Sequence, residues 1–231
     1  SDPTSFYIDA GLELSFWAIQ SGIWSIRNCA VMLFAALENK LFGSKKVGNT
    51  IVPYSGRLFF SKFKKLKGIL TDNFRKFLAI ESGSENTNSN SALESIFPIL
   101  TILSRLEPTN NFSNDLEDFK PFLLESLGIK YFKIREMAAR AIPSSIYEYE
   151  IFDEINMLLD RIDANPGLQN ELHGNLLAIN QLLIKSKRIS VENEKIPEEL
   201  VNRIIKSSPQ ILFNNKCYMN GKAYIDMLRL L

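Results

Sequence analysis

The sequence is poor in the residues on which most enzyme sites depend. It contains one histidine, His173, and two cysteines, Cys29 and Cys217, that lie far apart in the chain. A single histidine without clustered cysteine or carboxylate ligands cannot build a typical zinc site. No strand followed by a glycine-rich turn is visible, although a methyl donor or dinucleotide in a Rossmann-like fold requires one. We therefore expect no catalytic residue, no metal and no cofactor.

Long apolar runs and disulfide patterns are also missing. No stretch reaches the roughly 18 apolar residues needed to span a bilayer, so we expect no membrane association. The N-terminus shows no basic segment followed by an apolar core, as a signal peptide would. Secreted chains of this size more often carry several disulfides, so we expect both cysteines to be reduced and buried. These features predict a cytoplasmic protein, with the nucleus as the other reducing compartment.

Apolar residues recur at spacings of three and four along almost the whole chain, which predicts helices. The predicted helices cover residues 6–20, 23–42, 56–66, 71–80, 92–106, 116–127, 131–141, 144–160, 167–187, 197–206 and 216–231. Thr71 is a plausible N-cap, and Pro98 is expected inside its helix as a kink. With 11 glycines and 9 prolines in 231 residues, tight turns are few. The pattern predicts an all-α fold, an armadillo/HEAT-like α-solenoid of stacked helix pairs.

Two features concern how the chain is organised. The polar stretch 81–91 has almost no apolar side chains, so we expect a flexible loop. The chain also opens directly into an apolar helical run, whereas the end of a solenoid carries a polar cap. We therefore expect residues 1–231 to be the central segment of a longer solenoid.

One local pattern occurs twice. Ile26-Arg27 and Ile134-Arg135 each stand near the start of a predicted helix and are followed by small residues. Small residues let helices approach closely, and the arginine can bridge to an acidic or carbonyl group of the neighbouring repeat. Two ordinary amphipathic helices would fit the spacing equally well.

Further seam residues are predicted beside these arginines. We call the contact surfaces between neighbouring helices of the repeats seams. We expect structural roles at these seams for five residues: Trp24, Arg27, Asn28, Arg135 and His173. Trp24 should fill the seam with the preceding helix. Gly174 lies inside a helical pattern, where it costs about 1 kcal/mol relative to alanine. Close packing against another helix would explain that cost.

Four segments, in order, closely resemble the THADA family, named for thyroid adenoma-associated protein. They are Trp24 to Ala30 continuing to Gly43, Gly56 to Phe63, Arg135 to Ala141, and Leu172 to Leu177. The family includes the fungal non-catalytic partner of a tRNA ribose 2′-O-methyltransferase. The resemblance covers about residues 20–185, and we identify no further matching segment in the last 40 or so residues.

The resemblance implies a very large armadillo/HEAT-like protein that performs no chemistry itself. It implies a non-catalytic scaffold subunit, whose partners are tRNA and the catalytic subunit of a tRNA 2′-O-methyltransferase. That enzyme modifies the first nucleotide of the anticodon loop, position 32. Animal relatives have also been linked to energy metabolism and calcium handling. The alternative is therefore a protein-binding α-solenoid without an RNA role.

Charge is distributed very unevenly in this nearly neutral chain. Ten basic residues and one acidic residue, Asp72, lie between Lys40 and Lys76, while the net charge of the whole chain is +1. Such asymmetry predicts a local basic surface that could contact RNA phosphates. The predicted RNA-binding residues are Lys45, Lys46, Arg57, Lys62, Lys64, Lys65 and Lys67.

Two alternatives remain open for this segment. Tyr54, Phe59, Phe60 and Phe63 could stack on bases, although a core role is favoured for the phenylalanines. The basic surface could also be a solvated face that acidic neighbours in a longer protein balance.

Overall fold

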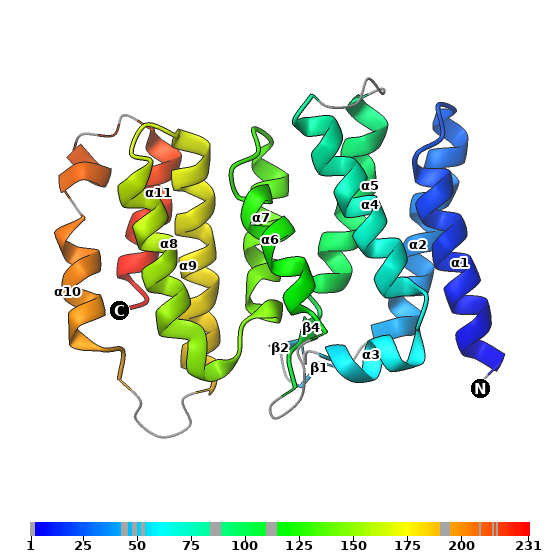
Figure 1. The fold of residues 1–231 in the computed structure, drawn as a ribbon, viewed down its shortest axis with the longest axis horizontal. Coiled ribbons are helices and arrows are strands. Elements are labelled where there is room, and N and C mark those ends of the chain that lie inside the picture. The colour runs from blue at the N-terminus through cyan, green and yellow to red at the C-terminus, as the bar shows by residue number, and fades with distance from the viewer. Residues whose placement is uncertain are drawn as a thin grey trace. The chain divides into compact units, whose positions relative to one another are not determined.

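The computed structural model describes residues 3–42, 46–47, 50–51, 54–83, 89–109, 115–189, 195–207, 209–213, 215 and 217–231. The chain divides into two compact units, unit 1 (Ser1–Phe122) and unit 2 (Leu123–Leu231). Figure 1 shows that long helices dominate both.

Unit 1 is built from consecutive helices that pack side by side. These are α1 (Pro3–Ile19), α2 (Trp24–Phe42), α3 (Gly56–Lys62), α4 (Leu66–Glu81) and α5 (Ser89–Leu103), with a 3-10 turn η1 (Glu117–Phe119). The helices α1 and α2 form one packed pair, and α4 and α5 form another. The first pair meets the second through α1, whose side chains Leu12, Phe16 and Ile19 are buried.

Four very short strands accompany the helices of unit 1. Strands β1 (Lys46–Val47) and β2 (Thr50–Ile51) are antiparallel. Strands β3 (Tyr54–Ser55) and β4 (Leu106–Glu107) are parallel. Each strand has only two residues, so the strand pairs form no extended sheet. They hold the chain in place just before the start of α3.

Unit 2 continues the helical pattern. The unit boundary falls within α6 (Lys120–Ser126), and the following elements are α7 (Phe132–Ala141), the 3-10 turns η2 (Ile142–Ser145) and η3 (Glu148–Glu150), α8 (Ile151–Ala164), α9 (Gln169–Ile189), α10 (Glu198–Lys206), a π-helical turn η4 (Pro209–Phe213) and α11 (Tyr218–Leu228). Helix α9 lies at the centre, because α7, α8 and α11 all pack against it.

Gly174 lies where α9 packs against another segment of unit 2. A Cβ atom at this position would lie 2.0 Å from the Leu127 carbonyl oxygen and 2.8 Å from the Leu127 Cα. These are backbone atoms, so no side-chain rotation could relieve the clash. The predicted close packing at Gly174 is therefore confirmed.

Three local predictions differ from the structure. Thr71 does not cap a helix, because α4 begins at Leu66 and the Thr71 hydroxyl donates to the Lys67 carbonyl, 2.9 Å away. The predicted helix 144–160 begins only at Ile151, because the 3-10 turns η2 and η3 occupy its first part. In the stretch 81–91, Glu81 ends α4 and Ser89 begins α5, while residues 84–88 lie outside the described residues.

The cysteines are both free, but the prediction that both are buried is wrong. Cys29 is exposed and Cys217 is half-buried. Cys29 lies on α2, on a side that no other described element covers. No helix among the described residues is long and apolar enough to cross a membrane.

Candidate nucleic-acid interface

The basic segment forms the corner between α3 and α4. The chain changes direction within three residues, Phe63 to Lys65. Phe63 and Leu66 are both buried in the core, and this holds the turn in place. The side chains of Arg57, Lys62, Lys64 and Lys65 are all exposed around this corner. The Lys62 ammonium lies over the Phe63 ring, 5.5 Å from its centroid.

Helix α4 extends the basic surface along one side. Lys65 has helical backbone angles (φ −77°, ψ −25°), so the helical periodicity runs through it into α4. Residues 11 apart lie on the same side of a helix and about 16 Å apart along its axis. Lys65 is therefore aligned with Lys76. Lys64 directly precedes Lys65, and Arg75 directly precedes Lys76. We call the exposed residues Lys64, Lys65, Arg75 and Lys76 the α4 basic stripe.

Arg75 and Lys76 were not among the predicted RNA-binding residues. The 11-residue spacing is the sequence signal that could have found them. The stripe also carries one negative charge, because the exposed Asp72 lies between its ends, with its carboxylate 3.9 Å from Arg75. The stripe remains net positive.

Lys67 has a different environment from its neighbours. Its ammonium lies 2.9 Å from the Asp118 carboxylate and 3.4 Å from that of Asp115. Burial alone would lower the pKa of Lys67, but these two ion pairs raise it above its ordinary value. Two carboxylates already neutralise this charge, so Lys67 is a poor candidate for phosphate binding.

Some predicted residues cannot be placed. Lys45 lies outside the described residues. Lys46 belongs to β1, but its side chain is not among those described.

The aromatic residues of the basic segment belong to the core. Phe59, Phe60 and Phe63 are buried, and the Phe59 ring stacks on Phe42 with centroids 5.6 Å apart. The preference for a core role of these phenylalanines is confirmed. Tyr54 is half-buried and meets Phe59 edge to face. This corner therefore offers charge to a phosphate backbone and no exposed aromatic ring for a base.

The two Ile-Arg pairs occupy equivalent positions. Arg27 is the fourth residue of α2, and Arg135 is the fourth residue of α7. Each Nη1 donates to a backbone carbonyl six residues earlier, Ser21 at 2.9 Å and Ile129 at 2.6 Å. Each arginine thus fastens the start of its helix to the turn before it.

Each arginine also reaches a second helix through Nε. Arg27 Nε donates to a Glu94 carboxylate oxygen of α5 at 2.9 Å. Arg135 Nε donates to His173 Nδ1 of α9 at 3.4 Å. Both arginines therefore join helices that are distant in sequence.

His173 is buried and neutral. Its side chain is only 3% exposed, and its ring lies 5.5 Å from that of Phe132. Burial, helped by the nearby Arg135 charge, lowers the pKa of His173 to about 4. The neutral ring can therefore accept a hydrogen bond from Arg135, which an imidazolium could not do.

The expectation for Trp24 is not met within unit 1. Trp24 is 70% exposed, and Asn28 is exposed as well. The seam between α1 and α2 is closed by Ala18 and Ala30, which are both buried. These two alanines, and not the Trp24 indole ring, form the buried contact between the two helices.

Comparison with known proteins gives a consistent result. A family model described as "Trm732, C-terminal TPR repeats" matches residues 27–182, which is more than half of the chain. This chain belongs to the Trm732/THADA family. The family model describes repeats of the α-solenoid class, and both units consist of packed helices. The predicted all-α fold of stacked helix pairs is therefore confirmed.

The chain is similar to proteins of fungi and of animals. The chain is 31% identical over 189 residues to "tRNA (32-2'-O)-methyltransferase regulator trm732" of Schizosaccharomyces pombe, covering 77% of this chain and 12% of the relative. It is 28% identical over 240 residues to "tRNA (32-2'-O)-methyltransferase regulator THADA" of Homo sapiens, covering 97% of this chain and 12% of the relative. The chain therefore spans only 12% of the length of these relatives. No solved structure matches it.

Proposed function

We propose that this chain is part of a non-catalytic subunit that binds tRNA and a partner methyltransferase. In this role it supports ribose 2′-O-methylation at position 32, the first nucleotide of the anticodon loop. The names of the relatives support the reaction, since they are called regulators of a tRNA (32-2'-O)-methyltransferase.

The α3–α4 corner is the part of the chain that we assign to tRNA. The observation that carries this assignment is the exposure of Arg57, Lys62 and the α4 basic stripe on consecutive elements. Positive side chains bind a phosphate backbone without reading its sequence, and a folded RNA is recognised largely by its shape. The burial of the phenylalanines supports binding through phosphate contacts and RNA shape, because their rings are not available to stack on bases.

The residues assigned to tRNA contact differ from the first expectation. We retain Arg57, Lys62, Lys64 and Lys65, add Arg75 and Lys76, and omit Lys67 because Asp115 and Asp118 neutralise it.

A methylation assay with the full-length protein tests the proposal. The full-length protein is combined with its partner methyltransferase, tRNA and methyl donor, and methylation at position 32 is measured. Replacing Lys62, Lys64 and Lys65 by Glu should weaken use of tRNA about tenfold or more at limiting tRNA, because three phosphate contacts become repulsive. In the matched control variant, Glu replaces Lys187, Lys195 and Lys206, which are exposed in unit 2.

The outcomes separate the two candidate functions. Reduced methylation in the first variant alone, with the methyltransferase still captured, supports tRNA binding at the α3–α4 corner. Equal methylation by both variants would remove this corner from the interface. If the full-length protein neither binds tRNA nor stimulates methylation, a protein-binding solenoid without an RNA role is the better description.

A further inference from the structure

The outer side of the first helix pair in unit 1 is apolar and open. Trp17 and Leu14 of α1 are 73% and 53% exposed, and Met32 of α2 is 65% exposed. Phe6 and Tyr7 of α1 are exposed as well. Single exposed apolar residues are normal in a soluble protein, but a contiguous set on two adjacent helices marks an interaction surface.

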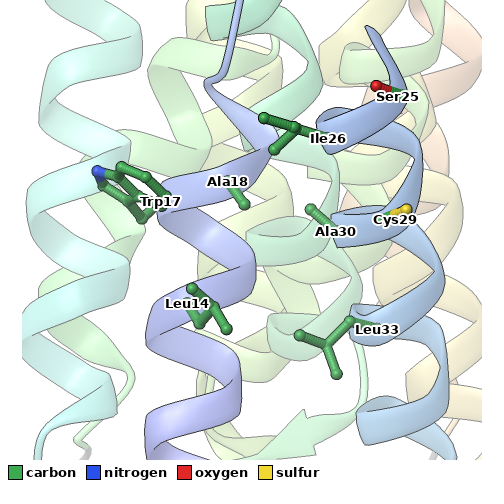
Figure 2. A pocket seen from close by; sticks show the side chains of 8 residues that line it. All are labelled: Leu14, Trp17, Ala18, Ser25, Ile26, Cys29, Ala30 and Leu33. Carbon is green, nitrogen blue, oxygen red and sulfur yellow. The ribbon is translucent and has the colours of Figure 1, made fainter. Parts of the chain in front are cut away.

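A groove runs along this surface between α1 and α2. Its volume is about 350 Å³, and its lining includes Leu14, Ala18, Ile26, Ala30 and Leu33. Figure 2 shows Ala18 and Ala30 between the two helices, with Leu14 and Leu33 further along them. Small side chains in the groove with larger ones around them are the surface into which a ridge of another helix packs.

Charged groups are missing from this groove. The charged residues of α1 are Asp9 and Glu13, and neither lines the groove. The first charged residue of α2, Arg27, is held by the Ser21 carbonyl and Glu94. Ser25 is the one hydroxyl in the lining. The groove therefore suits an apolar helix surface and offers little to RNA or to an acidic peptide.

Helix α1 is apolar on two sides. Ile8, Leu12, Phe16 and Ile19 are buried on one side, while the exposed Leu14 and Trp17 lie on the other. A helix that is hydrophobic all round is normally buried between neighbours. On its buried side, α1 already packs against the helix pair α4 and α5.

We propose that the α1–α2 groove is the docking site for a further helix pair of the same polypeptide in the full-length protein. Two observations favour this occupant over a different protein. The matched region is only 12% of the length of each named relative, and the family model describes the present repeats as C-terminal. In repeat proteins each repeat packs on its neighbours, and only the terminal repeats present a polar outer surface. This proposal does not depend on tRNA binding.

Cys29 provides a probe of the groove, because it lines the groove and its thiol is exposed in this structure. Full-length protein is treated with N-ethylmaleimide, and the labelling rate of Cys29 is measured on its peptide by mass spectrometry. The same protein unfolded in urea gives the reference rate. We expect labelling of native Cys29 to be about 100-fold slower or more than the reference, because a docked helix pair covers it. A native rate within about threefold of the reference would overturn the proposal.

Two further measurements identify what covers the groove. Leu14→Glu in the full-length protein should speed Cys29 labelling at least tenfold, because a carboxylate cannot be buried in the groove without a partner. The matched control Leu58→Glu, at an exposed leucine of α3, should leave the rate unchanged. Protection that rises with protein concentration would indicate a second copy of the protein in the groove and would also overturn the proposal.

Discussion

The two units of the chain fasten their helices with an arginine at the same position but in contrasting surroundings. In unit 1, Arg27 pairs with Glu94, whose side chain is 44% exposed. In unit 2, Arg135 is only 7% exposed and its partner His173 is buried and uncharged. The backbone anchor six residues earlier is the same in both. The anchor is thus a local property of the helix start, while the second partner depends on the surrounding packing.

This difference assigns separate tasks to the units. Unit 1 carries the exposed basic residues of the α3–α4 corner and the apolar groove between α1 and α2. Unit 2 carries the close approach of Gly174 to the Leu127 backbone and the buried Arg135–His173 pair. Substitutions at equivalent sites should therefore lower the free energy of unfolding far more in unit 2 than in unit 1.

The largest difference is expected between two glycines. Gly174→Ala places a methyl group against the Leu127 backbone and should destabilise the protein by about 3 kcal/mol or more. Gly68→Ala should be neutral or stabilise by up to about 1 kcal/mol, since no atom lies within 4 Å of the new Cβ. Urea unfolding followed by circular dichroism measures both. Similar effects of the two substitutions would show that the packing at Gly174 is not tight.

The arginines should differ by a smaller amount. Arg135→Met leaves the Ile129 and Lys130 carbonyls without their donor and should cost about 3 kcal/mol. Arg27→Met loses a partly exposed ion pair and one carbonyl bond, so about 1 kcal/mol is expected. The free energies of unfolding of both variants decide the matter. Equal losses in the free energy of unfolding would contradict the contrast between the partly exposed Arg27–Glu94 pair and the buried Arg135–His173 pair.

Acid should weaken unit 2 through His173. Its pKa is about 4 in the folded protein and has an ordinary value of 6.5 when unfolded. Below pH 6.5 the unfolded state binds a proton that the folded state does not, so stability falls as the pH drops from 6.5 to 4. The loss should lie between about 1 and 2 kcal/mol at pH 5.5 and reach about 3 kcal/mol near pH 4, and it vanishes above about pH 7.5.

A variant separates this loss from the titration of carboxylates. His173→Gln keeps a hydrogen-bond acceptor for Arg135 but has no proton to gain between pH 6.5 and pH 4. The difference in unfolding free energy between the two proteins should therefore change across this range. Parallel pH profiles would show that His173 titrates normally.

The sequence predicted the helices and the close packing at Gly174 because both depend on local periodicity and residue size. It also found the two arginines, whose anchoring bonds span only six residues. It did not predict the start of α4 at Leu66, because the turn at Phe63 to Lys65 is fixed by burial of side chains on both sides.

Other errors concern long-range contacts. The ion pairs of Lys67 with Asp115 and Asp118 were not foreseen, because these partners are about 50 residues away in the sequence. Trp24 was expected to fill the seam with the preceding helix and Cys29 to be buried, yet both are exposed in unit 1. Residue type alone does not tell which neighbour supplies the covering surface.

The salt dependence of tRNA binding by the full-length protein tests the proposed interface most directly. For the wild type and for the control variant at Lys187, Lys195 and Lys206, the logarithm of the affinity should fall steeply with the logarithm of salt concentration. Replacing Lys62, Lys64 and Lys65 by Glu should weaken binding and reduce this slope by about 3, one for each lost phosphate contact. An unchanged affinity and slope in that variant would contradict the account.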